Sequence, residues 1–171
     1  MLDKINTKDI VTIAKEAGDV IMQIYNQDFE VEYKQDSSPL TLADKKANDI
    51  IENSLNQLSV NLPILSEEGK DIPYEERKYW EYFWLVDPLD GTKEFVKKNG
   101  EFTVNIALIH KDTPVLGVVY APALDICYWA KQGEGAFKDG QRLPLKTESQ
   151  RETYKIVASR SHMSDETQAF I

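Results

Sequence analysis

Apolar residues in the first sixty positions recur at helical spacing in two separate stretches. In the first stretch, residues 7–25, the inward positions are Ile10, Ile13, Ala14, Ala17, Ile21 and Ile24. Spacings of three and four residues place such side chains on one face of a helix. Thr7 is suited to cap the start of this helix. The second stretch runs from Leu42 to Leu58, with Pro39 before it and Pro63 beyond its end. The pattern therefore predicts two amphipathic helices.

From Pro63 onward, the helical pattern gives way to short apolar runs separated by turn residues. These runs cover residues 63–65, 83–86, 102–109, 115–120, 126–130 and 155–158. Runs of this length between Gly, Pro and Asp residues are typical of strands. Because most of them follow one another without helical spacers, we expect a largely antiparallel sheet. The predicted fold class is α+β, with helices packed on that sheet.

The last residues predict the beginning of another element. Residues 164–167, Ser-Asp-Glu-Thr, resemble a capping box that opens a helix, only a few positions before Ile171. We therefore expect an N-terminal α+β metal-binding domain over residues 1–150. Residues 151–171 are then the start of a truncated second α/β domain.

Charge and composition narrow the class of protein. The 171 residues include 20 Lys and Arg against 29 Asp and Glu, a net charge of −9, which disfavours general nucleic-acid binding. Cys127, the only cysteine, excludes an internal disulfide and a zinc site built from several thiolates. The N-terminus lacks a signal-peptide pattern, and the most apolar region is too short to span a bilayer. We expect a cytoplasmic protein, with at most a peripheral association with the inner face of the cell membrane.

The strongest chemical motif follows the apolar run that ends at residue 86. Asp87 stands at the expected end of that strand, and a tight turn would aim Asp90 at the same point. The turn would also leave the carbonyl oxygen of Leu89 without a strand partner. Gly91 allows a ligand close to the backbone, and Thr92 adds a hydroxyl. These oxygen donors suit a hard cation such as Mg²⁺. In the alternative, Asp-Pro and Asp-Gly are ordinary turn dipeptides.

Two further acidic motifs allow a structural and a functional interpretation. Glu67 and Glu68 follow a short apolar run, and adjacent acids usually lie in solvent. If their strand neighbours that of Asp87, one of them completes a carboxylate cluster, and such a cluster implies a cation. Thr41 and Asp44 fit a capping box. In the functional alternative, Asp44 accepts a hydrogen bond from an active-site hydroxyl.

A fourth motif, residues 159–162, places Ser, Arg, Ser and His directly after the last predicted strand. The Arg and His side chains suit recognition of a phosphate or a base. A simple transition from strand to loop explains the same composition.

Taken together, these motifs resemble the lithium-sensitive, magnesium-dependent phosphatase family that includes inositol monophosphatase. The family's Asp-Pro-(aliphatic)-Asp-Gly-(Thr/Ser) motif stands here at residues 87–92, its acid pair at 67–68 and its Thr-x-x-Asp element at 41–44. Residues 92–95, 100–107 and 159–162 are similar to the 3′(2′),5′-bisphosphate nucleotidase branch of CysQ type. The resemblance runs from about residue 10 to the last residue. It implies the first part of a layered α/β sugar-phosphatase fold.

The resemblance also implies roles for particular residues. Mg²⁺ would be held by the side chains of Glu67, Asp87 and Asp90 and by the carbonyl of Leu89. The residues implied in catalysis are Asp44, Thr92 and Glu67, and the first two would position and deprotonate the attacking water. The residues implied in substrate binding are Glu67, Leu89, Asp90, Gly91, Thr92 and His162, the last near the nucleoside.

The implied reaction is hydrolysis of the 3′-phosphate of 3′-phosphoadenosine 5′-phosphate to AMP and phosphate, a step in sulfur assimilation. Three alternatives stay open: an inositol monophosphatase, an inactive fragment that binds metal or nucleotide without turnover, and a structural domain whose acids only form turns. The partner expected is a small nucleotide substrate and no nucleic acid.

One departure from the family pattern concerns a later Trp-Asp motif, whose Asp is a further metal ligand. None of Trp80, Trp84 and Trp129 is followed by Asp. We therefore expect a truncated member of the family. Apolar surface or a sheet edge left open by the truncation would favour self-association.

Overall fold

A computed structural model of the chain describes residues 1–33, 39–144, 158 and 163–170. Two long helices, α1 (Thr7–Tyr25) and α2 (Leu42–Asn56), pack against one sheet. The strands of that sheet are β3 (Ile64–Ser66), β4 (Tyr82–Asp90), β5 (Thr103–His110), β6 (Thr113–Ala121), β7 (Ile126–Lys131), β8 (Gly135–Lys138) and β9 (Gln141–Arg142). The smaller elements are the 3₁₀ helix η1 (Leu2–Lys4), the pair β1 (Val31–Tyr33) and β2 (Pro39–Thr41), α3 (Tyr74–Arg77), α4 (Thr92–Val96) and α5 (Asp165–Phe170).

The strand order in the sheet follows the chain, from β3 to β9. Every neighbouring pair is antiparallel except β3 and β4, which run parallel. This arrangement confirms the predicted α+β class and the largely antiparallel sheet. In the parallel pair, Ser66 lies opposite Val86. The residues that follow β3 and the second half of β4 are therefore at the same end of the sheet.

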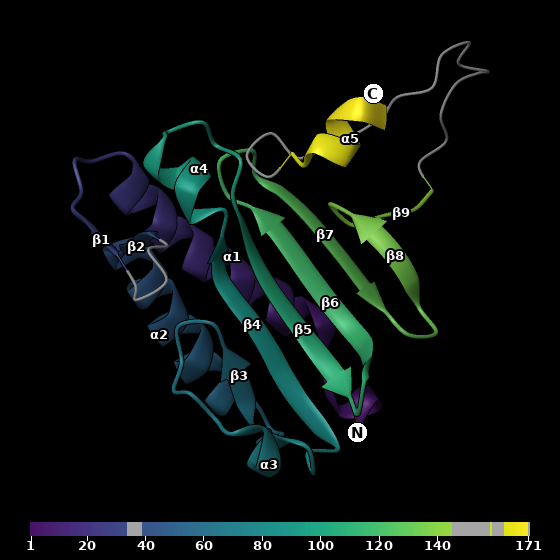
Figure 1. Ribbon diagram of the computed structural model, residues 1–171. Helices are drawn as coiled ribbons and strands as arrows, with labels where there is room; N and C mark the ends of the chain where they lie inside the picture. Colours follow the sequence, from purple (N-terminus) through teal and green to yellow (C-terminus); the bar gives the residue numbers. More distant parts are fainter. Residues whose placement is uncertain (34–38, 145–157, 159–162, 171) are drawn as a thin grey trace.

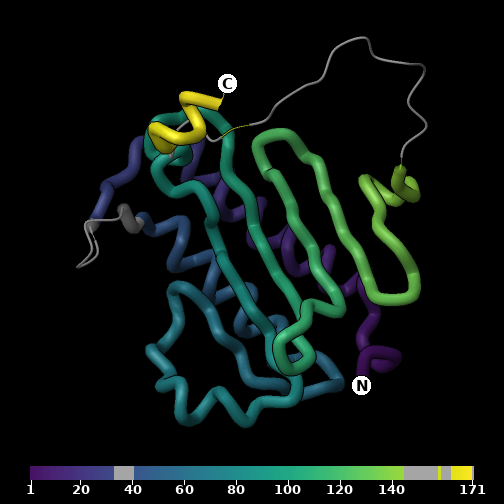
Figure 2. Tube along the Cα trace, turned by 45° about the vertical axis from the view of Figure 1, so that its right-hand side comes forward, coloured from purple at the N-terminus to yellow at the C-terminus, as the bar shows by residue number. Residues whose placement is uncertain are grey.

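Alternation along the strands separates a covered face from an open one. Inward side chains such as Trp84, Val104 and Leu108 are fully buried and join the helices in one core. Figure 1 and Figure 2 show α1 and α2 together on this face of the sheet. Leu85 and Val119 are instead 44% and 43% exposed, as expected for alternate positions that face away from the core. Self-association through this face stays a prediction.

Three local predictions need correction. Asn6, not Thr7, caps α1: its side chain accepts a hydrogen bond from the N–H of Lys8 at 3.2 Å, and Thr7 is the first helical residue. The second helix ends at Asn56, two residues before Leu58. The strand predicted to stop before Asp87 continues to Asp90. The register between β4 and β5 shifts between Asp87 and Asp90, so the chain bends there within the strand and not in a separate turn.

Other expectations concern the ends of the chain. The predicted C-terminal helix is confirmed as α5, where the side chain of Ser164 accepts a hydrogen bond from the N–H of Thr167 at 3.2 Å. The predicted strand over residues 155–158 lies outside the described residues except for Ala158, which is exposed and belongs to no strand. The domain boundary near residue 150 and the 159–162 cluster with His162 lie outside the described residues as well. Within the described part, none of the helices is long and apolar enough to cross a membrane.

Candidate active site

An irregularity in β4 shapes the centre of the site. Asp87 pairs with Asn105 and Asp90 with Thr103, so β4 has two residues between these pairs where β5 has one. Such a bulge bends a strand and redirects its side chains. Pro88 falls inside the bulge, where its missing N–H costs no regular ladder bond.

Gly91 joins β4 to α4 in a conformation that favours glycine. Its φ of 93° lies in the left-handed region, and a Cβ atom at this position would lie 2.8 Å from the carbonyl oxygen of Glu101. The turn places Thr92 as the first residue of α4. There the Thr92 hydroxyl lies 3.2 Å from the carbonyl oxygen of Leu89 and 3.2 Å from Oδ1 of Asp44.

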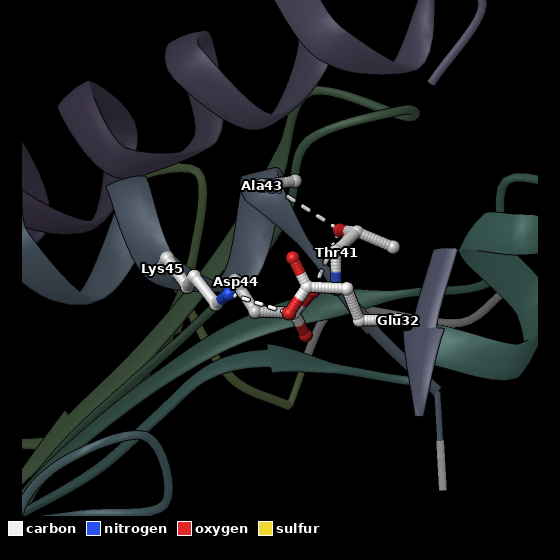
Figure 3. Close-up of polar contacts among 5 residues, drawn as sticks. All are labelled: Glu32, Thr41, Ala43, Asp44 and Lys45. Atoms are coloured by element: carbon white, nitrogen blue, oxygen red, sulfur yellow. Dashed lines mark hydrogen bonds and ion pairs between the residues drawn. The ribbon is translucent and has the colours of Figure 1, made fainter. Parts of the chain in front are cut away.

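Asp44 belongs to a complete capping box at the start of α2 (Figure 3). Its Oδ2 accepts hydrogen bonds from the N–H of Thr41 at 2.7 Å and from the Thr41 hydroxyl at 2.6 Å, and the Thr41 hydroxyl accepts from the N–H of Ala43. Burial raises the pKa of Asp44, and the hydrogen bonds from Thr41 and Thr92 partly offset that rise. The capping-box interpretation is confirmed, and the second oxygen of Asp44 meets the Thr92 hydroxyl, so the geometry is compatible with the functional interpretation, which stays a prediction.

Glu67 reaches the site because β3 lies beside β4. The N–H of Glu67 donates to the carbonyl oxygen of Val86 at 3.1 Å, immediately before Asp87. The hydroxyl of Ser66 donates to Oδ1 of Asn48 at 2.6 Å and so ties β3 to α2. The adjacency of these strands, which the sequence left conditional, is confirmed.

Asp87 lies at the centre of the negative charge. Its pKa is raised to about 7, first by burial, then by the charges of Glu67 and Asp90, with a smaller contribution from Asp44. Oδ1 of Asp87 is buried and has no hydrogen-bond partner within the part of the chain that the structure describes. Beside it lies a cavity of about 500 Å³, lined in part by Glu67, Asp87 and Asn105. The part of this rise that comes from Glu67 and Asp90 shows that the carboxylates of this cluster repel one another. A bound cation would offset that repulsion, so the cluster suits a cation site.

The donor set at this point fits Mg²⁺. The side chains of Glu67, Asp87 and Asp90 and the carbonyl of Leu89 offer only oxygen atoms, and Mg²⁺ binds through oxygen ligands. The buried, unpartnered oxygen of Asp87 is the group that a bound cation would satisfy. Within the described residues, no three acid, histidine or cysteine side chains already form a closed ligand group.

The structure unites most of the predicted site residues. Asp44, Leu89 and Thr92 are joined by hydrogen bonds, and Gly91 sets their turn. The residues coupled by charge are Glu67, Asp87 and Asp90. His162 lies outside the described residues.

Sequence reasoning gave no separate role to Asn105, whose Nδ2 donates to Oδ2 of Asp90 at 3.1 Å. It also missed Asn48, which lies on α2 beneath Ser66. The signal for Asn105 was a polar residue among the apolar positions of β5.

The sequence of the chain is similar to proteins of one known family. The model of the inositol monophosphatase family matches residues 3–170. The chain is 48% identical over 168 residues to the 3′(2′),5′-bisphosphate nucleotidase CysQ of Salmonella typhimurium, which covers 96% of this chain and 67% of the relative.

Solved structures give the same result. A crystal structure of CysQ from Bacteroides thetaiotaomicron, described as a bacterial member of the inositol monophosphatase family, has a TM-score of 0.75 and 41% identity; the match covers 96% of this chain and 66% of that one. An IMPase/NADP phosphatase complexed with Mg²⁺ and phosphate has a TM-score of 0.69 and 26% identity, over 80% of this chain and 51% of that one. The chain thus spans between half and two thirds of the length of these proteins.

Proposed function

The chain belongs to the inositol monophosphatase family, and from this premise we propose that it forms the metal-binding part of a Mg²⁺-dependent phosphomonoesterase. The substrate proposed is 3′-phosphoadenosine 5′-phosphate, which loses its 3′-phosphate to give AMP. The similarity to CysQ proteins supports this substrate over an inositol phosphate. A role in sulfur assimilation and a cytoplasmic location stay predictions.

The residues proposed to hold Mg²⁺ are Glu67, Asp87, Asp90 and, through its carbonyl, Leu89. When bound, Mg²⁺ neutralises charge on the phosphate and makes a coordinated water acidic enough to be a nucleophile near neutral pH. The buried oxygen of Asp87 that lacks a partner is the observation that carries this assignment.

Thr92 and Asp44 are proposed to activate the attacking water. The Thr92 hydroxyl already donates toward Oδ1 of Asp44 across 3.2 Å. When Thr92 takes a proton from water, its own proton passes to Asp44. Burial favours that transfer because it raises the pKa of Asp44 and so stabilises the protonated acid. Oδ2 keeps its bonds to Thr41, which hold the carboxyl in place.

The reaction is then an in-line displacement at phosphorus. The water oxygen forms a bond to phosphorus, the bond between phosphorus and the 3′-oxygen breaks, and that oxygen takes a proton from solvent. The backbone of Gly91 and Thr92 is proposed to face the phosphate, as the family resemblance implies. His162 is proposed to lie near the nucleoside.

The test is phosphate release from 3′-phosphoadenosine 5′-phosphate with Mg²⁺, run beside Asp87→Asn and beside inositol 1-phosphate as substrate. We expect release that depends on Mg²⁺, is lost in Asp87→Asn and is faster than release from inositol 1-phosphate. Faster release from inositol 1-phosphate would instead favour the inositol monophosphatase alternative. Calorimetric Mg²⁺ binding without turnover would identify a binding fragment. The absence of both Mg²⁺ binding and turnover would contradict the proposal.

A further inference from the structure

A second cavity, of about 630 Å³, lies between the first turns of α1 and the β7–β8 edge of the sheet. None of the candidate active-site residues that the structure describes lines it. We propose that this α1–β7 cavity binds a small organic anion: a planar ring that carries one carboxylate or phosphate group. The inference rests on charge, on one buried hydroxyl and on an aromatic wall, and it does not depend on the proposed function.

Three lysines make the cavity a cationic site in a chain of net charge −9. They are Lys8, Lys15 and Lys131. Lys8 makes no ion pair within the described part of the chain, and Lys15 makes a long ion pair, 3.7 Å, with the exposed Asp125 and lies 5.5 Å from the centroid of the Tyr120 ring. An incoming anion would therefore find ammonium groups whose charge is incompletely compensated.

The carboxylates that line the cavity already have partners. Oε1 of Glu134 lies 2.8 Å from Nζ of Lys131, and Oδ1 of Asp139 accepts the N–H of Cys127 at 2.8 Å. These contacts reduce the repulsion that a ligand anion would meet. The ion pair with Glu134 also holds Lys131, whose side chain is 11% exposed and donates to the carbonyl oxygen of Ile5.

Thr7 supplies an independent sign of a ligand. Thr7 is among the residues that line the cavity, it is 7% exposed, and its Oγ1 is buried without a hydrogen-bond partner among the described residues. Buried hydroxyls almost always have a partner, because leaving one unpaired costs free energy. Because Oγ1 is closed to solvent as the side chain stands, a ligand oxygen would provide that partner after the Thr7 side chain turns toward the cavity. Thr7 also begins the 19-residue helix α1, whose dipole favours negative charge at this end.

The ring of the ligand would lie against Trp129. This side chain stacks on Phe137 with ring centroids 4.0 Å apart and an interplanar angle of 14°, so its orientation is fixed. Val11 and the buried Cys127 extend the apolar surface. Planar rings stack on such a surface, and the cavity volume lies within the range of about 300–1,000 Å³ that small-molecule sites occupy.

The test uses 2-naphthoate as the probe, with calorimetry for affinity and NMR shift changes for location. We expect saturable binding whose shift changes lie at Thr7, Lys15 and Trp129. The amide 2-naphthamide has the same ring without the charge, and we expect it to bind at least about fivefold more weakly because it loses contact with the lysines. Asp87→Asn is expected to bind the probe as the wild-type chain does.

Two lysine variants provide a matched comparison. The side chains of Lys15 and Lys45 are both 46% exposed, and each makes one ion pair from a helix. We expect Lys15→Met to weaken 2-naphthoate binding about threefold and Lys45→Met to leave it unchanged. Trp129→Leu, checked for folding by circular dichroism, should weaken binding of both the acid and the amide.

Four outcomes would overturn the inference. They are no saturable binding at millimolar probe, equal affinity for acid and amide, equal effects of the two lysine variants, and shift changes confined to the open sheet face around Leu85 and Val119.

Discussion

The candidate active site has two halves: a hydroxyl half, formed by Thr41, Asp44 and Thr92, and a carboxylate half, formed by Glu67, Asp87 and Asp90. The halves differ in how completely the fold supplies hydrogen-bond partners for their carboxylate oxygens. In the hydroxyl half, both oxygens of Asp44 have hydrogen-bond donors, from Thr41 and from Thr92. In the carboxylate half, three acids lie near one another, and an oxygen of Asp87 is buried without a partner. Burial raises the pKa of the central acid in both halves, but only in the carboxylate half do neighbouring acids add substantially to that rise.

The contrast shows which part of the site is stable in the folded chain without a bound metal ion. Hydrogen bonds in the hydroxyl half stabilise a helix start and hold the Asp44 carboxyl beside the Thr92 hydroxyl at the same time. The carboxylate half gathers like charges, which oppose folding until a cation compensates them. We therefore expect the first half to contribute to stability without metal and the second to contribute only with it.

The largest effect should come from the aromatic anchor of the hydroxyl half. Phe95 is fully buried on α4, three residues after Thr92, and its ring packs 5.2 Å from Tyr25 and 5.3 Å from Phe102. We expect Phe95→Ala to lower the free energy of unfolding by about 3–5 kcal/mol, because it leaves a cavity in the core. Urea denaturation without metal measures this change.

A control for this prediction is Phe170→Ala, since Phe170 is 81% exposed on α5. Its free energy of unfolding should stay within about 0.5 kcal/mol of the wild-type value. If the two variants lose equal stability, the buried cluster does not hold α4 in place.

Patterns of a few consecutive residues made much of this architecture predictable. The apolar stripes gave both long helices, and the apolar runs gave the central strands within a few residues. The motifs of Glu67 and Asp87 were found because an acid follows an apolar run, and Asp44 because it fits a capping box with Thr41. The β1–β2 pair and strands β8 and β9 were missed, because strands of two to four residues carry too few side chains for alternation to appear.

Long-range contacts set the limit of sequence reasoning. That β3 lies parallel to β4 decides whether Glu67 joins the cluster, and no local spacing contains this information. The partnership of Asn105 with Asp90 likewise depends on the register between two strands. The N-cap of α1 was assigned one residue late because Asn6 and Thr7 are both good caps, and only packing places Thr7 inside the helix.

The second prediction concerns the cap of the hydroxyl half. Thr41→Ala removes the hydroxyl that accepts from Ala43 and donates to Asp44, so we expect a loss of about 1 kcal/mol in the free energy of unfolding. Mg²⁺ affinity, measured by calorimetry, should not change. Thr12→Ala is the matched control, because Thr12 bonds within a helix at an exposed position and caps nothing. A loss of Mg²⁺ binding in Thr41→Ala would mean that the two halves are not separate.

The third prediction concerns pH, and here the variant is expected to gain stability rather than lose it. The pKa of Asp87 rises from 3.8 to about 7 on folding, so between these pH values the folded chain binds more protons than the unfolded chain. The stability that Asp87 contributes is present below pH 3.8 and is lost as pH rises toward about 7. At pH 8 without metal, Asp87→Asn should therefore be more stable than the wild-type chain. We expect a gain of about 1 kcal/mol, because water screens charges at this partly exposed position.

Thermal unfolding at pH 4 and pH 8, with and without Mg²⁺, checks this prediction. Saturating Mg²⁺ should remove the advantage of Asp87→Asn, because a cation stabilises the charged wild-type cluster. Asp71→Asn serves as the control, since Asp71 is an exposed acid outside the cluster. If Asp87→Asn is less stable than the wild-type chain at pH 8 without metal, repulsion does not dominate the carboxylate half.

The smallest effect should come from the rim of the carboxylate half. Asn105 donates to Asp90, but Asp90 is exposed, and water can replace the lost bond. We expect Asn105→Ala to weaken Mg²⁺ binding about threefold, the low end for a single hydrogen bond, with little change in stability. Asn105→Asp adds a like charge beside Asp90, so it should lower the free energy of unfolding without metal and strengthen Mg²⁺ binding. Lower stability without metal together with stronger Mg²⁺ binding is expected only if repulsion between carboxylates limits the stability of the carboxylate half. A loss of Mg²⁺ affinity in Asn105→Ala as large as in Asp87→Asn would instead make Asn105 a ligand and move the boundary of the cluster onto β5.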